Sequence, residues 1–202
     1  MKERGMIFNG EMVRAILDGR KTQTRRPIKW KQTRFTEIGE REDGSKWPWS
    51  EDAEHACDFW HPCPFGDVGD RIWVRETWNK YGGLLTYRAD HDWIDDMRKE
   101  TVCTAKWVPS IHMPRWASRI LLEITDVRVE RLNSISQEDA QAEGLELTGW
   151  RPTYSDPDSG GEVMTPYDNF AQLWESIYGE ESWKANGWVW VISFKRVEGG
   201  AA

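Results

Sequence analysis

Residues 16–26 read ILDGRKTQTRR, and this run of charged and hydroxyl groups is the most informative feature of the chain. A short amphipathic helix is expected to stop at Gly19. Four cations then follow with two threonine hydroxyls among them, up to a proline at position 27. Like charges disfavour the protonated form of Lys21, and a lysine with a lowered pKa beside a threonine can act as base and nucleophile. The alternative is a solvated basic strand edge or a phosphate-contacting patch, because runs of charge usually lie at the surface.

The composition predicts one domain of a cytoplasmic protein. The 202 residues are enough for a buried core with large insertions. The mean hydropathy is -0.73, and no apolar run approaches the ~20 residues of a membrane span. The N-terminus MKERGMIFNG has no apolar signal core. The net charge of -7 argues against a broad nucleic-acid-coating surface, but it leaves room for a pocket that binds one nucleotide.

Fourteen tryptophans are an extreme count for this length. Several lie in polar, turn-rich segments: Trp30, Trp47, Trp49, Trp60 and Trp93. A large side chain that needs a partner for its N–H is hard to explain in such places. Three roles stay open for them: stacking on bases, closing over a small core, or forming a partner surface.

Residues 55–63, HACDFWHPC, place four potential metal ligands close together. A zinc site usually draws its ligands from two separated pairs, and no second pair follows here. The three cysteines of the chain are expected to stay reduced in the cytoplasm. We therefore expect a loop with incidental thiols and no metal or other cofactor, with a zinc site as the alternative.

Hydrophobic periodicity predicts short helices and antiparallel strands. The helices are expected over residues 9–18, over 136–143, and from an N-cap at Asp168 to Gly179; the strands over 70–78, 84–88, 117–132 and 188–197. Segments rich in charge, proline or glycine are expected to be insertions or loops: 29–66, 90–116 and 145–166, with a flexible tail at 198–202. This pattern predicts an α+β fold, a mixed or antiparallel β-barrel with short flanking helices and long loop insertions.

Three segments, in this order, resemble the ASCH domain, a relative of the PUA fold. They are the helix and turn at 16–26, the turn and strand GDRIWVRE at 69–76, and the helix ISQEDAQAEG at 135–144. The aromatic strand at 189–194 fits the closure of a barrel. The stretches MPRWASR at 113–119 and WESIYG at 174–179 resemble longer members found in prophages. The resemblance implies a single PUA-like domain over residues 1–197, whose cleft accepts a nucleobase or nucleoside.

Some small members of that family are amidohydrolases that remove the acyl group from N(4)-acetylcytidine. Their lysine, threonine and glutamate match Lys21, Thr24 and Glu143 of this sequence. Other relatives bind RNA or modified DNA bases, and a few are nucleases, so the fold alone does not settle the function. Two alternatives stay open: a non-catalytic reader of RNA or modified nucleobases, and a phage-encoded protein that binds a host protein through its tryptophan-rich insertions.

Amide hydrolysis needs a nucleophile, a base, an acid for the leaving nitrogen, and stabilisation of the oxyanion. Thr24 is the expected nucleophile, with Thr22 as the alternative. Lys21 is the expected base, although residues three apart in an extended segment do not share a face, so a turn must bring Lys21 and Thr24 together. Glu143 is the expected acid; a carboxylate at a helix end is unfavourable beside the helix dipole, which favours a functional role. Arg26 or a backbone amide is expected to hold the oxyanion.

Further substrate-binding residues are expected outside the triad. Glu76 is a candidate to hold the base or to replace the acid. Trp116 is expected to contact the substrate, and Thr22 and Arg26 complete this group. Arg75 and Arg115 are candidate substrate clamps, with salt bridges at the rim of a barrel as the alternative. The expected partner is a small modified nucleoside; nucleic acid is disfavoured by the net charge, and no membrane partner is expected.

Overall fold

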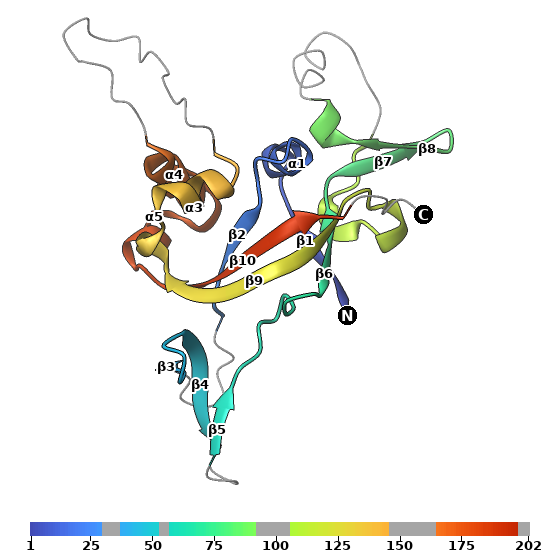
Figure 1. Cartoon of the computed structure of the whole chain (residues 1–202). Coiled ribbons are helices and arrows are strands. Elements are labelled where there is room, and N and C mark those ends of the chain that lie inside the picture. Colours follow the sequence, from blue (N-terminus) through green and yellow to red (C-terminus); the bar gives the residue numbers. More distant parts are fainter. Residues whose placement is uncertain (30–36, 53–56, 92–105, 146–164, 198–202) are drawn as a thin grey trace, which may run out of the picture. The chain divides into compact units, whose positions relative to one another are not determined.

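A computed structural model gives the structure of the protein (Figure 1). It describes residues 1–29, 37–52, 57–91, 106–145 and 165–197. The chain is a mixed α+β protein that divides into two compact units. Unit 1 comprises Met1–Gly19, Pro64–Thr125 and Phe194–Ala202; unit 2 comprises Arg20–Cys63 and Asp126–Ser193.

Unit 1 is built on strands β1 (Glu3–Ile7), β6 (Arg71–Arg75) and the first part of β9 (Leu121–Arg131). Strand β1 pairs in parallel with β6, and β6 pairs antiparallel with β9. The alternation predicted for residues 70–78 is confirmed, because positions 72, 74 and 76 are buried while 73, 75 and 77 are partly exposed. Unit 1 also contains a hairpin of β7 (Trp78–Tyr81) and β8 (Leu84–Tyr87).

Strand β1 was not expected from the sequence, and one glycine explains how it fits. A Cβ built on Gly5 would lie 2.6 Å from the ring of Trp73, its register partner on β6. Only a residue without a side chain allows the tryptophan ring to cross the strand at this point. The close approach therefore requires glycine for steric reasons.

Helix α1 (Gly10–Leu17) confirms the helix predicted next to the basic run. The Asn9 side chain accepts a hydrogen bond from the N–H of Met12 at 2.8 Å and so caps the helix. The apolar face buries Val13 and Ile16. Gly19 follows the helix with a φ of 75°, a conformation that favours glycine and redirects the chain towards the cations.

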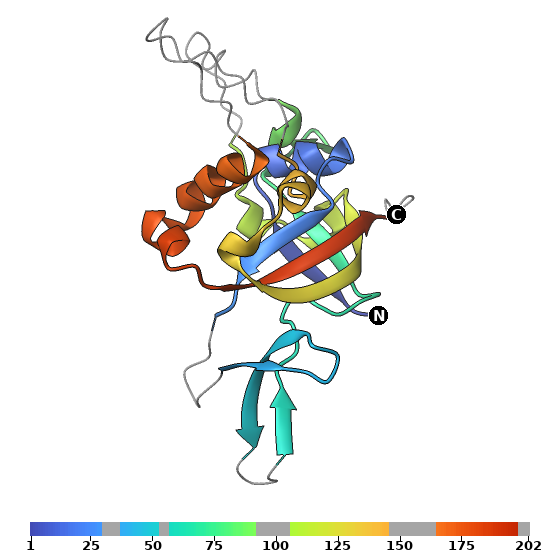
Figure 2. The same cartoon turned by 60° about the vertical axis from the view of Figure 1, so that its left-hand side comes forward.

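Unit 2 contains β2 (Gln23–Pro27), β10 (Trp188–Arg196) and the second part of β9. Strands β2 and β10 are antiparallel, with Thr24 opposite Ile192. Helix α3 (Gln137–Ala142) packs against β2 and against α4 (Pro166–Tyr178), which α5 (Glu180–Lys184) follows (Figure 2). Their shared core comprises Leu132, Ile135, Ala140, Phe170, Trp174, Val189 and Val191. The predicted strand at 188–197 is confirmed, and all of positions 189–192 are buried.

One expectation about the helices needs correction, and one helix was not expected. Helix α4 is capped by Thr165, not by Asp168, because the Thr165 hydroxyl accepts from the N–H of Asp168 while the Asp168 carboxylate accepts from the N–H of Thr165. Pro166 occupies the first turn, where its missing N–H has no cost. The short helix α5 was missed because five residues carry too little periodicity to stand out.

The segment expected to be an insertion or long loop contains a three-stranded antiparallel sheet. It is formed by β3 (Glu37–Glu40), β4 (Lys46–Asp52) and β5 (Cys57–Trp60). Arg41 lies over the rings of Trp47 and Trp60, 4.0 and 5.4 Å from their centroids. These contacts favour the small-core role for these two tryptophans.

Two indole N–H groups in this small sheet have partners. Trp47 donates to the carbonyl of His61 at 2.7 Å, and Trp49 donates to the Asp58 carboxylate at 3.0 Å. Trp47 also packs edge-on against the buried Trp190 of β10, with 5.0 Å between the ring centroids. Of the five tryptophans singled out from the sequence, positions 30 and 93 lie outside the described residues.

The strand order of the main sheet is β1-β6-β9-β10-β2. Strands β1 and β6 belong to unit 1 and β2 to unit 2, whereas β9 and β10 contribute residues to both units. Within the described ranges this order does not close into a barrel, so the PUA-like barrel stays a prediction. Most of the loop expected at 145–166 and the tail at 198–202 lie outside the described residues. None of the helices described is both long and apolar enough to cross a membrane.

Candidate functional site

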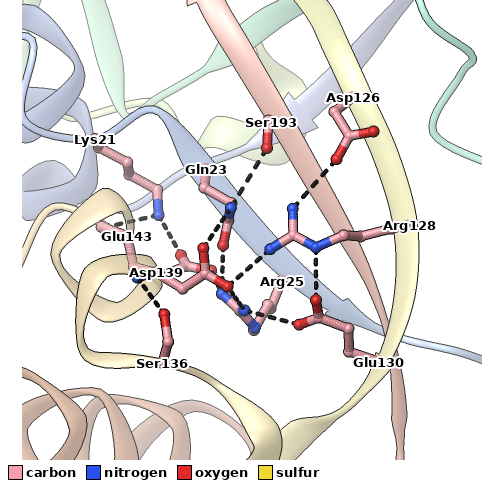
Figure 3. A network of polar contacts seen from close by, with 10 residues as sticks. All are labelled: Lys21, Gln23, Arg25, Asp126, Arg128, Glu130, Ser136, Asp139, Glu143 and Ser193. Carbon is pink, nitrogen blue, oxygen red and sulfur yellow. Dashed lines mark hydrogen bonds and ion pairs between the residues drawn. The ribbon is translucent and has the colours of Figure 1, made fainter.

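Lys21 and Glu143 form a buried ion pair in unit 2 (Figure 3). The Lys21 Nζ donates to Glu143 Oε2 at 2.6 Å and to the backbone carbonyl of Glu143 at 2.9 Å. Their side chains are 0% and 3% exposed. The two residues also form an isolated antiparallel β-bridge. The structure therefore brings together two of the three residues predicted to carry the chemistry.

The end of helix α3 explains why the pair forms. The last carbonyls of a helix have no partner inside it and attract cations and N–H donors. Here the N–H of Thr22 donates to the carbonyl of Ala142 at 2.8 Å, and Arg20 donates to the carbonyl of Gly144 at 2.9 Å. Lys21 lies between these two contacts, so its ammonium meets both the helix end and the Glu143 carboxylate. The unfavourable position of Glu143 beside the helix dipole is offset by this cation.

Burial lowers the pKa of Lys21 below its ordinary value of 10.5. The charge and hydrogen bond of Glu143 oppose this effect, while Arg26 and Arg25 add to it. The direction agrees with the sequence prediction, but burial is a larger cause than like charge. A lysine in this environment reaches the neutral, basic form at a lower pH than an exposed lysine does.

Arg25 connects this pair to two further carboxylates (Figure 3). Its Nη2 donates to Asp139 Oδ2 at 2.8 Å and to Glu130 Oε2 at 3.1 Å. Its Nη1 donates to Gln23 Oε1 at 2.5 Å and lies 3.5 Å from Glu143 Oε1. The Arg25 side chain is 0% exposed. A continuous set of charged contacts thus runs from the buried pair to the partly exposed Asp139 and Glu130.

Arg128 on β9 closes the outer end of this network. It donates to Asp139 Oδ2 at 2.7 Å, to Glu130 Oε1 at 2.6 Å and to Asp126 Oδ2 at 3.2 Å. Partial burial alone raises the pKa of Asp139, but the hydrogen bonds and charges of Arg25 and Arg128 outweigh it, so the net pKa is lowered. Asp139 is therefore a carboxylate held between two guanidinium groups.

Thr24, the predicted nucleophile, is the second residue of β2 and is 2% exposed. The side chains of Gln23 and Arg25 both contact Asp139 on α3. Because strand side chains alternate, Thr24 faces the other side of the sheet. Within the described ranges, no hydrogen bond joins the Thr24 hydroxyl to Lys21 or Glu143. Lys21 and Thr24 thus do not share a face, as their spacing indicates.

Thr22 and Arg26, the other predicted site residues of unit 2, differ in exposure. Thr22 is exposed and Arg26 is partly buried. Arg26 lies opposite Trp190 of β10 in the sheet register. By the same alternation Arg26 shares the face of Thr24, which is the arrangement that an oxyanion partner of Thr24 needs.

The remaining predicted site residues belong to unit 1, and their contacts are given within that unit. Arg75 donates to the backbone carbonyls of Ser110 (3.2 Å) and Ile111. Arg115 donates to the Glu3 carboxylate at 2.9 Å, and both side chains are partly exposed. Arg115 thus forms a salt bridge, which was the alternative to a substrate clamp, whereas the contacts given for Arg75 are to backbone carbonyls.

Glu76 is buried, and both of its oxygens accept hydrogen bonds from Arg119, at 2.9 and 3.0 Å. Burial raises the pKa of Glu76, and Arg119 opposes that rise. Arg119 also binds both oxygens of Asp90, at 2.7 and 2.8 Å. Trp116 is 60% exposed and packs edge-on against Trp78. Among these residues, Trp116 has the ring surface that is open to a ligand.

The network around Arg25 was not predicted from the sequence. Two signals for it were present. Asp139 and Glu143 are four residues apart, which places them on one face of α3. Gln23 and Arg25 are two residues apart, which places them on one face of β2. What the sequence could not supply was the pairing of that strand with that helix.

No metal centre is found among the residues that the structure describes, where no group of three His, Cys, Asp or Glu side chains is arranged to hold an ion. Of the four ligands considered in the 55–63 segment, His55 lies outside the described residues. Cys57 is exposed and Cys63 is partly exposed. The His61 ring contacts the Ser50 hydroxyl at 2.9 Å.

Comparison with known proteins gives no match to a protein-family model, to a curated protein or to a solved structure. The class of protein is therefore inferred from the contacts of unit 2 and from the sequence motifs. The geometry defines a buried lysine–glutamate pair at a helix end, backed by an arginine–carboxylate network. Such a pair can accept a proton at one group and deliver a proton from the other.

Proposed function

We propose that the protein is an amidohydrolase that removes the acyl group from N(4)-acylated cytosine nucleosides. The observation that carries this proposal is the 2.6 Å contact between the buried Lys21 Nζ and Glu143 Oε2. Perturbed ionisable groups gather at functional sites, because chemistry needs pKa values matched to the task. The ASCH-like order of residues 16–26, 69–76 and 135–144 supplies the substrate class, and with it the proposal of a PUA-like barrel.

The proposed reaction begins from the form of the pair in which the shared proton lies on Glu143 and Lys21 is neutral. The Thr24 hydroxyl oxygen then attacks the acyl carbonyl carbon while Lys21 accepts the hydroxyl proton. Arg26 or a backbone N–H stabilises the oxyanion of the tetrahedral intermediate. The C–N bond then breaks, and Glu143 gives a proton to the exocyclic amine of cytosine as it leaves. Water hydrolyses the resulting threonine ester, which releases the carboxylic acid and restores the Thr24 hydroxyl.

The contact between Lys21 and Glu143 gives the proton a path between base and acid. A proton that Lys21 takes from Thr24 can pass along the 2.6 Å hydrogen bond to Glu143 and replace the one delivered to the leaving amine. In the structure Glu143 holds Lys21, and Thr24 faces the other side of the sheet, so the first transfer requires residues 21–24 to rearrange when substrate binds. Contacts that tighten only with substrate are common in active sites.

The burial of the two threonines favours Thr24 over Thr22 as nucleophile. Thr24 is 2% exposed, whereas Thr22 is exposed to solvent. An acyl-enzyme ester is protected from competing reactions when its site excludes bulk water. Thr22 contributes its backbone N–H to the end of α3, which positions Lys21.

The test is to incubate the purified protein with N(4)-acetylcytidine and to follow the release of cytidine by its absorbance change. We expect turnover, and we expect Lys21→Ala and Glu143→Ala each to lower the rate by at least ~100-fold. Asp18→Ala, on an exposed residue at the end of α1, is the control and should keep the wild-type rate. Absence of turnover on any N(4)-acylated cytosine compound would favour a non-catalytic reader of RNA or modified bases.

A further inference from the structure

Arg25 lies between the Lys21–Glu143 pair and two more carboxylates (Figure 3). We propose that Arg25 is a positioning residue for this pair: Asp139 and Glu130 hold its guanidinium, which presents a fixed cation to Glu143 and governs where the shared proton rests. The inference rests on the proposed function, because it assigns Arg25 a part in the chemistry of that pair. It goes beyond the predicted triad, which does not include Arg25.

The contacts of Arg25 come from several elements, and together they fix its position. Asp139 on α3 and Glu130 on β9 accept from Nη2, and Gln23 on its own strand accepts from Nη1. The guanidinium carbon also lies 5.8 Å from the ring centroid of Phe170 on α4. A guanidinium does not lose its proton in proteins. Arg25 is therefore a permanent charge in a fixed place.

The sign of its effect follows from electrostatics. A fixed cation stabilises the Glu143 carboxylate and destabilises the Lys21 ammonium. Arg26 acts on Lys21 in the same direction. Asp139 offsets part of the charge of Arg25 and so acts in the opposite direction. Removing the charge of Arg25 should raise the pKa of Lys21, and removing the charge of Asp139 should lower it.

This reversal of sign is the basis of the test. The full-length protein is labelled with 15N-lysine, and the Lys21 Nζ resonance, assigned with Lys21→Met, is followed by NMR as the pH is changed. We expect Arg25→Met to raise the titration midpoint of Lys21 by about 1 pH unit and Asp139→Asn to lower it by a similar amount. Arg25→Lys keeps the charge and should stay near the wild-type midpoint.

Lys184→Met is the matched control, because it removes one exposed cation of unit 2 that pairs with carboxylates on its own helix. In this variant the titration midpoint of Lys21 should equal that of the wild type. If Arg25→Met does not fold, the other two variants still test the proposal. A lowered titration midpoint of Lys21 in Asp139→Asn and an unchanged midpoint in Arg25→Lys support it. Unmoved midpoints, or shifts of one sign in Arg25→Met and Asp139→Asn, would overturn it.

The NMR readout also separates this inference from the proposed function. If N(4)-acetylcytidine is turned over, the acidic limb of the pH profile of kcat/KM should move with the Lys21 midpoint in each variant. If there is no turnover, the hydrolase proposal fails, while the midpoints still show whether Arg25 governs the pair. A structural role alone would change stability without moving the two midpoints in opposite directions.

Discussion

Replacing Glu143 by glutamine tests the buried pair through the stability of the fold. The substitution keeps the size of the side chain and removes its charge. It leaves the ammonium of Lys21, whose side chain is 0% exposed, without its carboxylate partner. Breaking a buried pair in this way is strongly destabilising, because one charge stays buried and uncompensated.

The size of the loss at pH 7 can be bounded in two ways. A charged Lys21 that has lost its partner costs about 3–5 kcal/mol. A neutral Lys21 costs about 1.4 kcal/mol for each of the about 3.5 pH units below its ordinary pKa of 10.5, or about 4.9 kcal/mol. We therefore expect the free energy of unfolding to fall by about 3–5 kcal/mol at pH 7. At pH 9 the neutral form costs only about 2 kcal/mol, so the loss should shrink to about that value.

The sign of this pH dependence follows from linkage. In the variant the folded-state pKa of Lys21 lies further below its unfolded value, so the unfolded chain binds more protons and stability rises with pH up to about 10.5. The measurement is urea unfolding at pH 7 and pH 9, followed by tryptophan fluorescence. Glu180→Gln, which breaks the exposed Glu180–Lys184 pair, is the control and should cost less than about 1 kcal/mol. A loss below about 1 kcal/mol for Glu143→Gln, or one equal at both pH values, would refute the reasoning.

Further outcomes are expected from other parts of the chain. Thr24→Ala should lower turnover of N(4)-acetylcytidine by at least ~100-fold, whereas Thr22→Ala should keep most of it; the reverse result in the absorbance assay would make Thr22 the nucleophile. The lowered pKa of Asp139 stabilises the fold above its unfolded value near 3.8 and ceases to do so as the pH falls through the folded value, so acid titration should show the stability difference between wild type and Asp139→Asn shrinking below about pH 4. Gly5→Ala should lower the free energy of unfolding by about 1–3 kcal/mol in urea, because its methyl group meets the Trp73 ring. Unmodified RNA should bind weakly at moderate salt, given the net charge of -7; tight, salt-sensitive binding in a fluorescence titration would favour the reader function.

Elements with a clear apolar period and a local cap could be predicted from the sequence. Helix α1 has Asn9 at its start, and α3 has Ser136, whose hydroxyl accepts from the N–H of Asp139 at 3.0 Å. Strands β6, β8 and β10 either alternate apolar with polar residues or are continuously apolar. These signals are local, so no knowledge of the tertiary fold is needed to read them.

Strand β2 could not be predicted as a core strand, because its buried face is polar. Positions Gln23 and Arg25 are buried like core residues, at 5% and 3% exposure, yet a hydropathy pattern counts them as surface. Their burial is compensated by carboxylates from α3 and β9, which only the tertiary fold brings near. Lys21 and Glu143 were named as site residues from family resemblance, but their contact was not predicted. Arg25 was missed for the same reason that β2 was missed.

The pair at the end of α3 also has a consequence for how the protein folds. Lys21 and Glu143 are 122 positions apart, so their contact closes a long loop of chain. Long-range contacts of this kind form late, after the entropy of loop closure has been overcome. An ammonium cannot be buried without its counter-ion, so residues 20–25 must stay hydrated until α3 has docked. During synthesis strand β2 therefore waits for a helix made more than a hundred residues later, and the buried ion pair forms only in the last steps of folding.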